Sequence, residues 1–313
     1  MLLTQLLIKL YIFMKLTAKI ISVLQESYKK KSLRHLYDSF WLFVYSTFKL
    51  PSLKKALKEQ KLEKTFLQLE KIIQNYSQHY NHAKIEGEYW NYKVRALHSF
   101  QVNFGMNSIQ RVKENLNKNH LTLVDIGDSS GTHTLYLKTL IKEFNIKALS
   151  VNLDQNAIKK IKDKGLEAIH SKAEDLDKYN INPDLFMSFQ TVEHLNSPIN
   201  FLKSISQNTN CNYFLITVPY ISSSRIGLEH IRGNLETKVH AENIHIFELS
   251  PQDWKLLFKH SGWEIVDETV YFQYPKKHFL RILKKSWAKY DFEGFYGVLL
   301  KKNHYWTDKY LDW

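Results

Sequence analysis

The chain has 313 residues, of which 44% are apolar and 24% charged, as is typical of a globular rather than a disordered protein. A single hydrophobic core commonly stops growing near ~250 residues, so we expect one α/β domain and an added region. Cys211 is the only cysteine, which excludes an internal disulfide framework and a cysteine-based structural zinc site. These features favour a cytoplasmic protein.

The net charge of +13 is concentrated near the N-terminus. Residues 1–118 hold 20 Lys and Arg against 8 Asp and Glu, whereas residues 119–313 hold 24 against 23. This distribution tells against a catalytic domain that clamps along nucleic acid. It indicates that the N-terminal part meets an anionic partner, such as a membrane surface or a charged glycan carrier, although a solvated lysine-rich helical face explains it equally well.

Residues 2–28 are strongly apolar, but Lys9, Lys15 and Lys19 interrupt them. No apolar run reaches the ~20 residues that span a bilayer, and the pattern of a signal peptide is absent. Their polar side chains gather on one side at helical spacing, which predicts an amphipathic helix. This helix either lies on an anionic membrane, at its inner face, or packs on the rest of the protein.

Further apolar patterns before residue 118 predict more helices. The stretch Phe40–Phe48 ends ahead of Pro51, and proline disfavours helical backbone at the residue before it. Ser52 is expected to cap a helix that extends through Ile73, and another helix is expected over Tyr89–Asn115. We therefore assign residues 1–118 to a basic helical N-terminal extension.

From Leu121 the pattern changes to short apolar runs that alternate with segments of helical length, as in βαβ units with a parallel sheet. This second region extends to residue 302 and leaves 303–313 as a C-terminal tail. Seven strands are predicted, at Leu121–Ile126, Ala148–Leu153, Ala168–His170, Asp184–Phe189, Tyr213–Val218, Glu264–Phe272 and Phe295–Leu300. Helices are predicted between them at Thr132–Phe144, Gln155–Lys164, Pro198–Gln207 and Pro251–Ser261.

The first predicted strand ends in a glycine-bearing turn, Asp125–Gly131, directly before a helical pattern. Glycine lets the backbone approach a ligand closely, and a helix N-terminus favours anionic or polar groups. An ordinary tight turn explains this motif when it is taken alone. The second strand, however, ends in Asn152-Leu153-Asp154, where a nucleotide-binding α/β fold places an acceptor for ribose hydroxyls.

Two later segments follow strands in the same way, Ala173–Leu176 after the third and Gln190–Leu195 after the fourth. With these motifs in order, residues 119–302 resemble the class I S-adenosylmethionine-dependent methyltransferases, and in particular the branch with ubiquinone-pathway O-methyltransferases and small-molecule and glycan enzymes. The resemblance implies an α/β fold with a Rossmann-like seven-stranded sheet of order 3-2-1-4-5-7-6. Helices cover both faces of that sheet, and its last strand is antiparallel.

The resemblance also implies S-adenosylmethionine as the cofactor. The positions that it assigns to this cofactor are Asp125, Gly127, Asp128, Gly131, Asn152, Leu153, Asp154, Glu174, Asp175 and Gln190. The first four fall on the methionine and ribose side, Asn152 at the ribose hydroxyls, and Leu153 beside adenine. Glu174 and Asp175 match the region that meets the adenine amino group, and Gln190 begins the loop under the sulfonium.

The sequence departs from the family pattern at two of these motifs. Ser129 stands where the middle glycine of the Gly-x-Gly-x-Gly turn is usual, and Asn152 stands where the family has a carboxylate. Asn can still accept one hydrogen bond from a ribose hydroxyl, and Asp154 is the alternative acceptor. Exchanging a charge-assisted bond for a neutral one is expected to weaken cofactor binding by ~1 kcal/mol.

In ubiquinone-pathway relatives, the loop after the fourth strand supplies two glutamates and a histidine to a divalent metal. Gln190 stands at the first of these positions, and its amide oxygen is a poorer ligand for a hard cation than a carboxylate, so we assign no metal. Glu193 and His194 then either support the loop structurally or act as a general base. In the long connection after the fifth strand, His240 and His245 are further candidates for a base.

The reaction implied is transfer of a methyl group to an acceptor oxygen, in which positioning and modest base assistance do most of the work. We expect a glycan, lipid-linked or small-molecule acceptor. DNA is not expected, because Gln190-Thr191-Val192-Glu193 stands where base-modifying enzymes carry Asp/Asn-Pro-Pro-Tyr/Phe. The alternative is a binding or scaffold protein that keeps the fold but has lost transfer, which the departures at Ser129 and Asn152 motivate.

Overall fold

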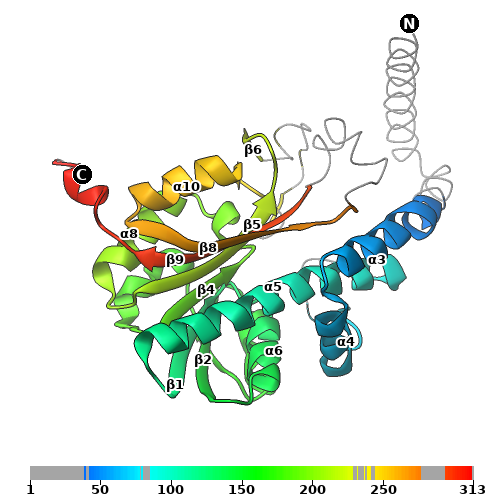
Figure 1. Ribbon diagram of the computed structural model, residues 1–313, viewed down its shortest axis with the longest axis horizontal. Helices are drawn as coiled ribbons and strands as arrows, with labels where there is room; N and C mark the ends of the chain where they lie inside the picture. The colour runs from blue at the N-terminus through cyan, green and yellow to red at the C-terminus, as the bar shows by residue number, and fades with distance from the viewer. Residues whose placement is uncertain are drawn as a thin grey trace, which may run out of the picture.

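The computed structural model describes residues 39, 42–77, 79, 85–227, 231, 236, 238–240, 244–275 and 293–311. Its centre is a seven-stranded sheet of order β3-β2-β1-β4-β5-β9-β8 (Figure 1). The strands are β1 His120–Ile126, β2 Asn145–Asn152, β3 Glu167–His170, β4 Leu185–Phe189, β5 Tyr213–Tyr220, β8 Trp263–Phe272 and β9 Gly294–Lys302. Counted along the chain, this is the predicted order 3-2-1-4-5-7-6, so the expected sheet is confirmed.

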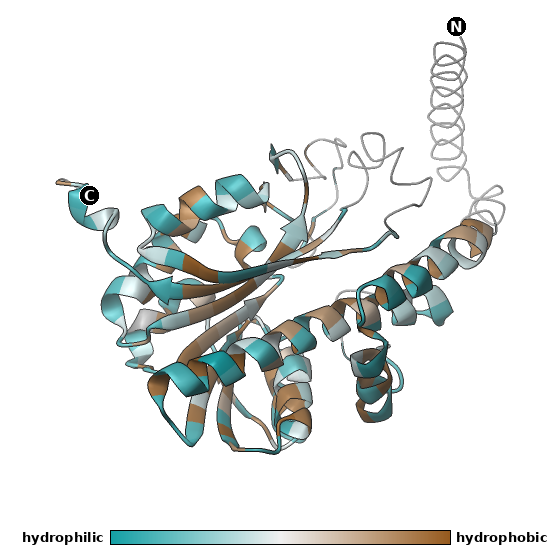
Figure 2. Ribbon diagram, in the orientation of Figure 1, coloured by the Kyte–Doolittle hydropathy of each residue, from teal (hydrophilic) through white to brown (hydrophobic). Residues whose placement is uncertain are grey.

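Strands β1 to β5 pair in parallel, whereas β9 is antiparallel to both of its neighbours, β5 and β8. The antiparallel last strand was also expected. The central strands are apolar on both sides: all five residues of β4 are buried, and the strands are predominantly brown in Figure 2. Burial of both faces is the rule for parallel strands, because crossover helices cover the two faces of the sheet.

Successive strand residues belong to different cores, as the two-residue period of a strand requires. Leu123 and Met187 pack on one face with α5 (Gly87–Leu116) and α6 (Thr132–Leu140). Val124 and Phe186 pack on the other face with α8 (Pro198–Asn208) and α10 (Pro251–His260). Helix α7 (Gln155–Asp163) contributes Ile158 and Ile161 to a smaller cluster beside β3. The result is a three-layer sandwich with helices on both faces (Figure 1).

The helices before α5 differ from the predicted pattern. Ser52 does not cap a helix: a π-helical turn, Tyr45–Lys49, runs directly into α3 (Leu50–Glu59), and Leu50 ahead of Pro51 has helical backbone. Pro51 has no N–H to donate, and the turn before it is π-helical, with the Leu50 N–H bonded to the carbonyl of Tyr45 five residues back. The predicted single helix is also broken, since Lys61 adopts a positive φ before α4 begins (Glu63–Ile72).

Helix α5 closely matches the helix predicted over Tyr89–Asn115, and it ends at Asn117 in the left-handed conformation. Although it lies in the predicted extension, it contributes Val102 and Phe104 to the core beneath the sheet. The division at residue 118 therefore stays a prediction. No helix among the described residues is long and apolar enough to cross a membrane. The amphipathic helix predicted for residues 2–28 lies outside the described residues.

Two boundaries in the α/β region also differ from the predicted ones. Helix α6 ends at Leu140 instead of Phe144, because Ile141 already has extended backbone. Strand β2 begins earlier than predicted, at Asn145, and pairs with β1 from its first residue. A two-stranded ribbon that was not predicted pairs β6 (Arg225–Ile226) with β7 (Phe247–Glu248).

Candidate functional site

The strand order reverses between β1 and β4, because the chain moves from β1 toward β3 in one direction and from β4 toward β5 in the other. At such a switch point the loops after the two strands diverge, and open α/β sheets bind their ligands there. The loop after β1, here called the glycine loop, is Gly127–Gly131. The loop after β4, here called the β4 loop, is Gln190–His194.

The two loops touch at Gly127. A Cβ atom on this residue would lie 2.1 Å from Thr191 Oγ1 and 2.7 Å from Thr191 Cγ2, so no side chain fits there. Its φ of 87° is also one that L-residues rarely adopt, and its N–H donates to the carbonyl of Val151 at 2.8 Å. Glycine is therefore required at Gly127 by the chain itself, before any ligand is considered.

The end of the glycine loop is equally constrained, but its middle is not. Gly131 has a φ of 74° at the N-cap position of α6, and a Cβ there would approach Leu166 Cδ1 to 2.8 Å. Ser129, which replaces the usual middle glycine, is not among the residues with positive φ. The backbone therefore accommodates a serine at this position without the strain that a left-handed conformation would impose.

At the end of β2, the side chains predicted to meet ribose already bind the chain. Asn152 Nδ2 donates to the carbonyl of Asp128 at 3.2 Å, and its Oδ1 accepts from the N–H of Asp154 at 2.7 Å. Asp154 in turn caps α7, since its Oδ1 accepts from the N–H of Asn156 at 2.8 Å. Asn152 thus ties the glycine loop to β2.

The residues that were predicted to lie near adenine follow strands β2 and β3. Leu153 is 63% exposed and leaves an apolar side chain at this edge of the sheet. Glu174 is exposed and Asp175 partly exposed in the short 3₁₀ helix Ala173–Tyr179 that follows β3. Asp175 forms an ion pair with Lys178 at 2.5 Å, which lowers the pKa of its carboxyl.

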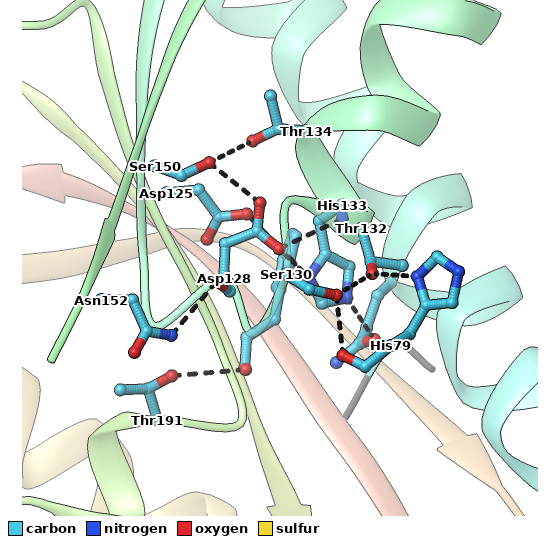
Figure 3. A network of polar contacts seen from close by, with 12 residues as sticks. His79, Asp125, Asp128, Ser130, Thr132, His133, Thr134, Ser150, Asn152 and Thr191 are labelled. Atoms are coloured by element: carbon cyan, nitrogen blue, oxygen red, sulfur yellow. Dashed lines mark hydrogen bonds and ion pairs between the residues drawn. The ribbon is translucent and has the colours of Figure 1, made fainter. Parts of the chain in front are cut away.

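Asp128 of the glycine loop forms a buried cluster with Asp125 of β1 and His133 of α6 (Figure 3). His133 Nδ1 lies 3.9 Å from Asp125 Oδ2 and 3.7 Å from Asp128 Oδ1. Burial and the neighbouring Asp128 raise the pKa of Asp125 well above its ordinary value. Burial also opposes ionisation of Asp128, but its contacts with His133 and a hydrogen bond from Ser150 at 3.1 Å lower its pKa.

A chain of hydrogen bonds connects this buried cluster to the β4 loop. His133 Nε2 contacts Gln101 Oε1 at 3.0 Å, and Gln101 Nε2 donates to Thr217 Oγ1 at 3.1 Å. Gln190 Nε2 reaches the same hydroxyl at 3.3 Å. Gln190 has a φ of 56°, a conformation that is costly for any residue other than glycine. Two hydrogen bonds to Thr217, one from the side chain and one from the backbone of Gln190, hold it in this conformation.

A second cluster of ionisable groups lies at the end of the β4 loop. Ligand atoms of Glu193, His194 and His245 all lie within 4.8 Å of one another, so these residues could hold a metal ion. His194 Nε2 is 3.9 Å from Glu193 Oε1, and the two imidazole rings are 4.7 Å apart. Glu193 is fully buried, and burial, opposed in part by His245, raises its pKa to about 7.

Backbone and side-chain contacts orient these two histidines. His194 Nδ1 is 2.8 Å from the carbonyl of Ile244, so it carries the proton of that bond. His245 Nδ1 lies 3.5 Å from Glu248 Oε1, and the N–H of Ile246 donates to the carbonyl of Glu193 at 2.9 Å. The structure thus brings together three of the four predicted catalytic candidates. The fourth, His240, is exposed and is not a member of this cluster.

Sequence reasoning missed the contact of the N-terminal region with the glycine loop. Ser130 Oγ donates to the carbonyl of His79 at 2.7 Å, and Lys164 Nζ donates to the carbonyl of Ser130. Burial and the charges of Lys164 and Lys160 lower the pKa of His79 to about 4, so its imidazole is neutral. His133 and Gln101 were not predicted from the sequence either. For Gln101 the available signal was a polar residue on the apolar face of a long helix.

No protein-family model matches the chain, and no curated protein matches it. Solved structures similar to it include 1,6-didemethyltoxoflavin-N1-methyltransferase from Burkholderia thailandensis with bound S-adenosylhomocysteine, at 14% identity and a TM-score of 0.43, covering 67% of this chain and 85% of that one. Another is an O-methyltransferase from a Brevibacillus brevis multienzyme in complex with S-adenosyl-L-homocysteine, at 13% identity and a TM-score of 0.43, covering 63% of this chain and 71% of that one. An S-adenosylmethionine-dependent methyltransferase from Clostridium acetobutylicum matches at 12% identity and a TM-score of 0.41, covering 63% of this chain and 90% of that one.

Proposed function

We propose that this protein is a class I S-adenosylmethionine-dependent methyltransferase that modifies an oxygen of a glycan, lipid-linked or small-molecule acceptor. The observation that carries the proposal is the switch point between β1 and β4, with a glycine loop that leads into α6 on one side and the β4 loop on the other. Both loops lie at the carboxyl ends of parallel strands, where this kind of sheet binds nucleotide-like ligands.

The residues around the switch point fit S-adenosylmethionine in most respects. The glycine loop offers backbone groups at the start of a helix, and the exposed Leu153 offers an apolar surface for adenine. Glu174 and Asp175 follow β3 at the same edge of the sheet. The ribose position departs from the pattern, because Asn152 uses both ends of its amide within the chain; its Oδ1 still has a second lone pair for a ribose hydroxyl.

When bound, S-adenosylmethionine supplies an electrophilic methyl group. The chain must then orient the acceptor and take up the proton of its hydroxyl group. Glu193 suits proton uptake, because a pKa of about 7 lets its carboxyl gain or lose a proton near neutral pH. Because Glu193 is fully buried, the proton reaches it through His194 and His245, which are partly exposed beside it.

The acceptor class and the location of the enzyme are inferred from charge. The excess of Lys and Arg in residues 1–118 favours an anionic partner, and the α/β region with its near-zero net charge disfavours DNA. We therefore propose a cytoplasmic enzyme that is peripheral to the inner membrane face, which it meets through residues 2–28. A basic extension of this kind would bring the active site close to lipid-linked or surface glycans.

The cofactor proposal is tested by titrating the full-length protein with S-adenosylhomocysteine in a calorimeter. We expect saturable binding that Leu153→Asp weakens at least tenfold, because a carboxylate there removes apolar contact with adenine. Leu153 is 63% exposed, so the melting temperature should be nearly unchanged. Leu256→Asp on α10 is the matched control, since Leu256 is 57% exposed and lies outside the two loops. Absence of binding at millimolar ligand would refute the proposal.

The same protein distinguishes an enzyme from a scaffold that only keeps the fold. Binding of S-adenosylhomocysteine without methyl transfer to any acceptor in a panel of glycans and lipid-linked sugars would favour the scaffold alternative, which the engaged Asn152 side chain motivates. Transfer that is lost in Glu193→Gln while cofactor binding persists would favour the enzyme.

A further inference from the structure

Gln101, on helix α5, makes hydrogen bonds to two residues that in turn contact the two loops of the switch point. Its amide oxygen Oε1 contacts His133 Nε2 at 3.0 Å, and its amide nitrogen Nε2 donates to Thr217 Oγ1 at 3.1 Å. Gln101 is 1% exposed and Thr217 is fully buried, so water does not replace these bonds. A buried polar group that loses its partner is costly, and both contacts therefore constrain His133 and Thr217.

On the side of the glycine loop, Gln101 fixes the ring of His133. Because the amide oxygen can only accept, the contact requires a proton on His133 Nε2. The backbone N–H of His133 donates to Asp128 Oδ1 at 3.4 Å, and its Nδ1 lies 3.7 Å from the same oxygen (Figure 3). Asp128 belongs to the glycine loop, so the orientation of the His133 ring affects the position of that loop.

On the side of the β4 loop, Gln101 acts through Thr217. The Thr217 hydroxyl also accepts from Gln190 Nε2 at 3.3 Å, so the two glutamine amides occupy both lone pairs of this oxygen. The Thr217 carbonyl accepts from the N–H of Gln190 at 2.8 Å. Gln190 is the first residue of the β4 loop and has the costly φ of 56°, so its conformation depends on Thr217 being held in place.

We propose that Gln101 is a positioning residue that holds the glycine loop and the β4 loop in the relative arrangement that binds S-adenosylmethionine. Its role in binding rests on the proposed function, since these are the two loops assigned to the cofactor. One amide with an end toward each loop makes the positions of the two loops interdependent. Helix α5, which the sequence places in the N-terminal extension, thereby takes part in cofactor binding without contacting the reacting atoms.

The first test measures binding of S-adenosylhomocysteine to full-length Gln101→Met by calorimetry. Methionine is similar in length but lacks the amide, and we expect an affinity about tenfold lower. The matched control is Ser99→Ala on the same helix, which removes a buried bond from Ser99 Oγ to the carbonyl of Arg95 at 2.6 Å. The control should bind as the unaltered protein does. Unchanged affinity in a destabilised Gln101→Met would show a merely structural role and overturn the proposal.

A double-mutant cycle with Thr217→Val tests the link to the β4 loop. Gln101→Met should weaken binding less in the Thr217→Val background than in the unaltered protein, because the bond between the two side chains is already lost. Ser99→Ala combined with Thr217→Val should give additive effects. Additive effects of Gln101→Met and Thr217→Val would contradict an action of Gln101 through Thr217.

Nitrogen-15 NMR of the histidine rings tests the link to the glycine loop without any ligand. His133 Nε2 should carry a proton in the unaltered protein and should lose it in Gln101→Met, where it has no amide oxygen to donate to. An unprotonated Nε2 in the unaltered protein would overturn the proposal even if the variant does not fold, and so would a retained proton in a folded variant. If the unaltered protein binds no S-adenosylhomocysteine, the proposed function fails, whereas the NMR signal still decides whether Gln101 holds His133.

Discussion

Each of the two loops at the switch point lies beside a cluster of carboxylates and histidines, but the two clusters differ in their exposure. Below the glycine loop, Asp125, Asp128 and His133 are sealed between β1, α5 and α6, and their contacts lead further into the protein. At the end of the β4 loop, Glu193 is buried, but His194 and His245 keep part of their surface exposed. Access, rather than residue type, therefore separates a cluster suited to hold a loop from one suited to exchange protons.

The largest effect on stability is expected at Gly127, where the two loops touch. Gly127→Ala should reduce the free energy of unfolding by about 3 kcal/mol, because a left-handed alanine costs about 1 kcal/mol and the clash with Thr191 adds the remainder. Unfolding in urea measures the loss. The atoms nearest to such a Cβ belong to Thr191, so the loss is expected in the protein without any ligand.

Gly165→Ala is the matched control for this change. Gly165 has a similar φ of 70°, but a Cβ there meets nothing within 4 Å, so only the backbone strain of about 1 kcal/mol should appear. Thr191→Gly in the Gly127→Ala background should restore part of the lost stability. Equal losses for the two alanine variants would show that the loops do not touch as described.

The second prediction concerns Glu193, the buried carboxyl at the end of the β4 loop, and the pH dependence of stability that it causes. Burial raises its pKa from 4.5 to about 7, so the folded protein favours the neutral carboxyl, and the resulting stability is present below pH 4.5 and lost as the pH rises through 7. Between pH 5 and pH 8 the unaltered protein should lose about 2–3 kcal/mol relative to Glu193→Gln. Parallel pH profiles of unfolding for the two proteins would contradict the raised pKa.

The sheet was predictable because its signals are local and repeated. Each parallel strand is an apolar run followed by a helical pattern, and the alternation of Leu123 and Val124 between two cores follows directly from strand geometry. The failures have equally local causes. Ser52 looked like a cap only if Pro51 ended the preceding helix, yet the helical backbone continues from the π-helical turn Tyr45–Lys49 through Pro51 into α3.

The candidate site was less predictable, because its clusters depend on contacts between distant segments. Glu193 and His245 were singled out separately, but their meeting depends on the backbone bond from Ile246 to Glu193, which no local pattern reveals. His133 was not singled out at all, since a histidine in the first turn of a helix is common and its burial follows only from the packing of α5. The cofactor roles of the predicted residues stay predictions.

The smallest effect is expected at Asn152, which stands where the sequence resemblance predicts a carboxylate. Asn152→Asp introduces the carboxylate that the sequence resemblance predicts at ribose, but it removes the donor to the Asp128 carbonyl and sets a negative charge beside it. We expect a loss of about 1 kcal/mol in stability and no gain in affinity for S-adenosylhomocysteine, because the loop that must hold the ligand is loosened. Asn156→Asp, an exposed change of the same chemistry in the first turn of α7, should be neutral or slightly stabilising through the helix dipole. Tighter binding by Asn152→Asp at unchanged stability would mean that Asn152 weakens ribose recognition instead of securing the glycine loop.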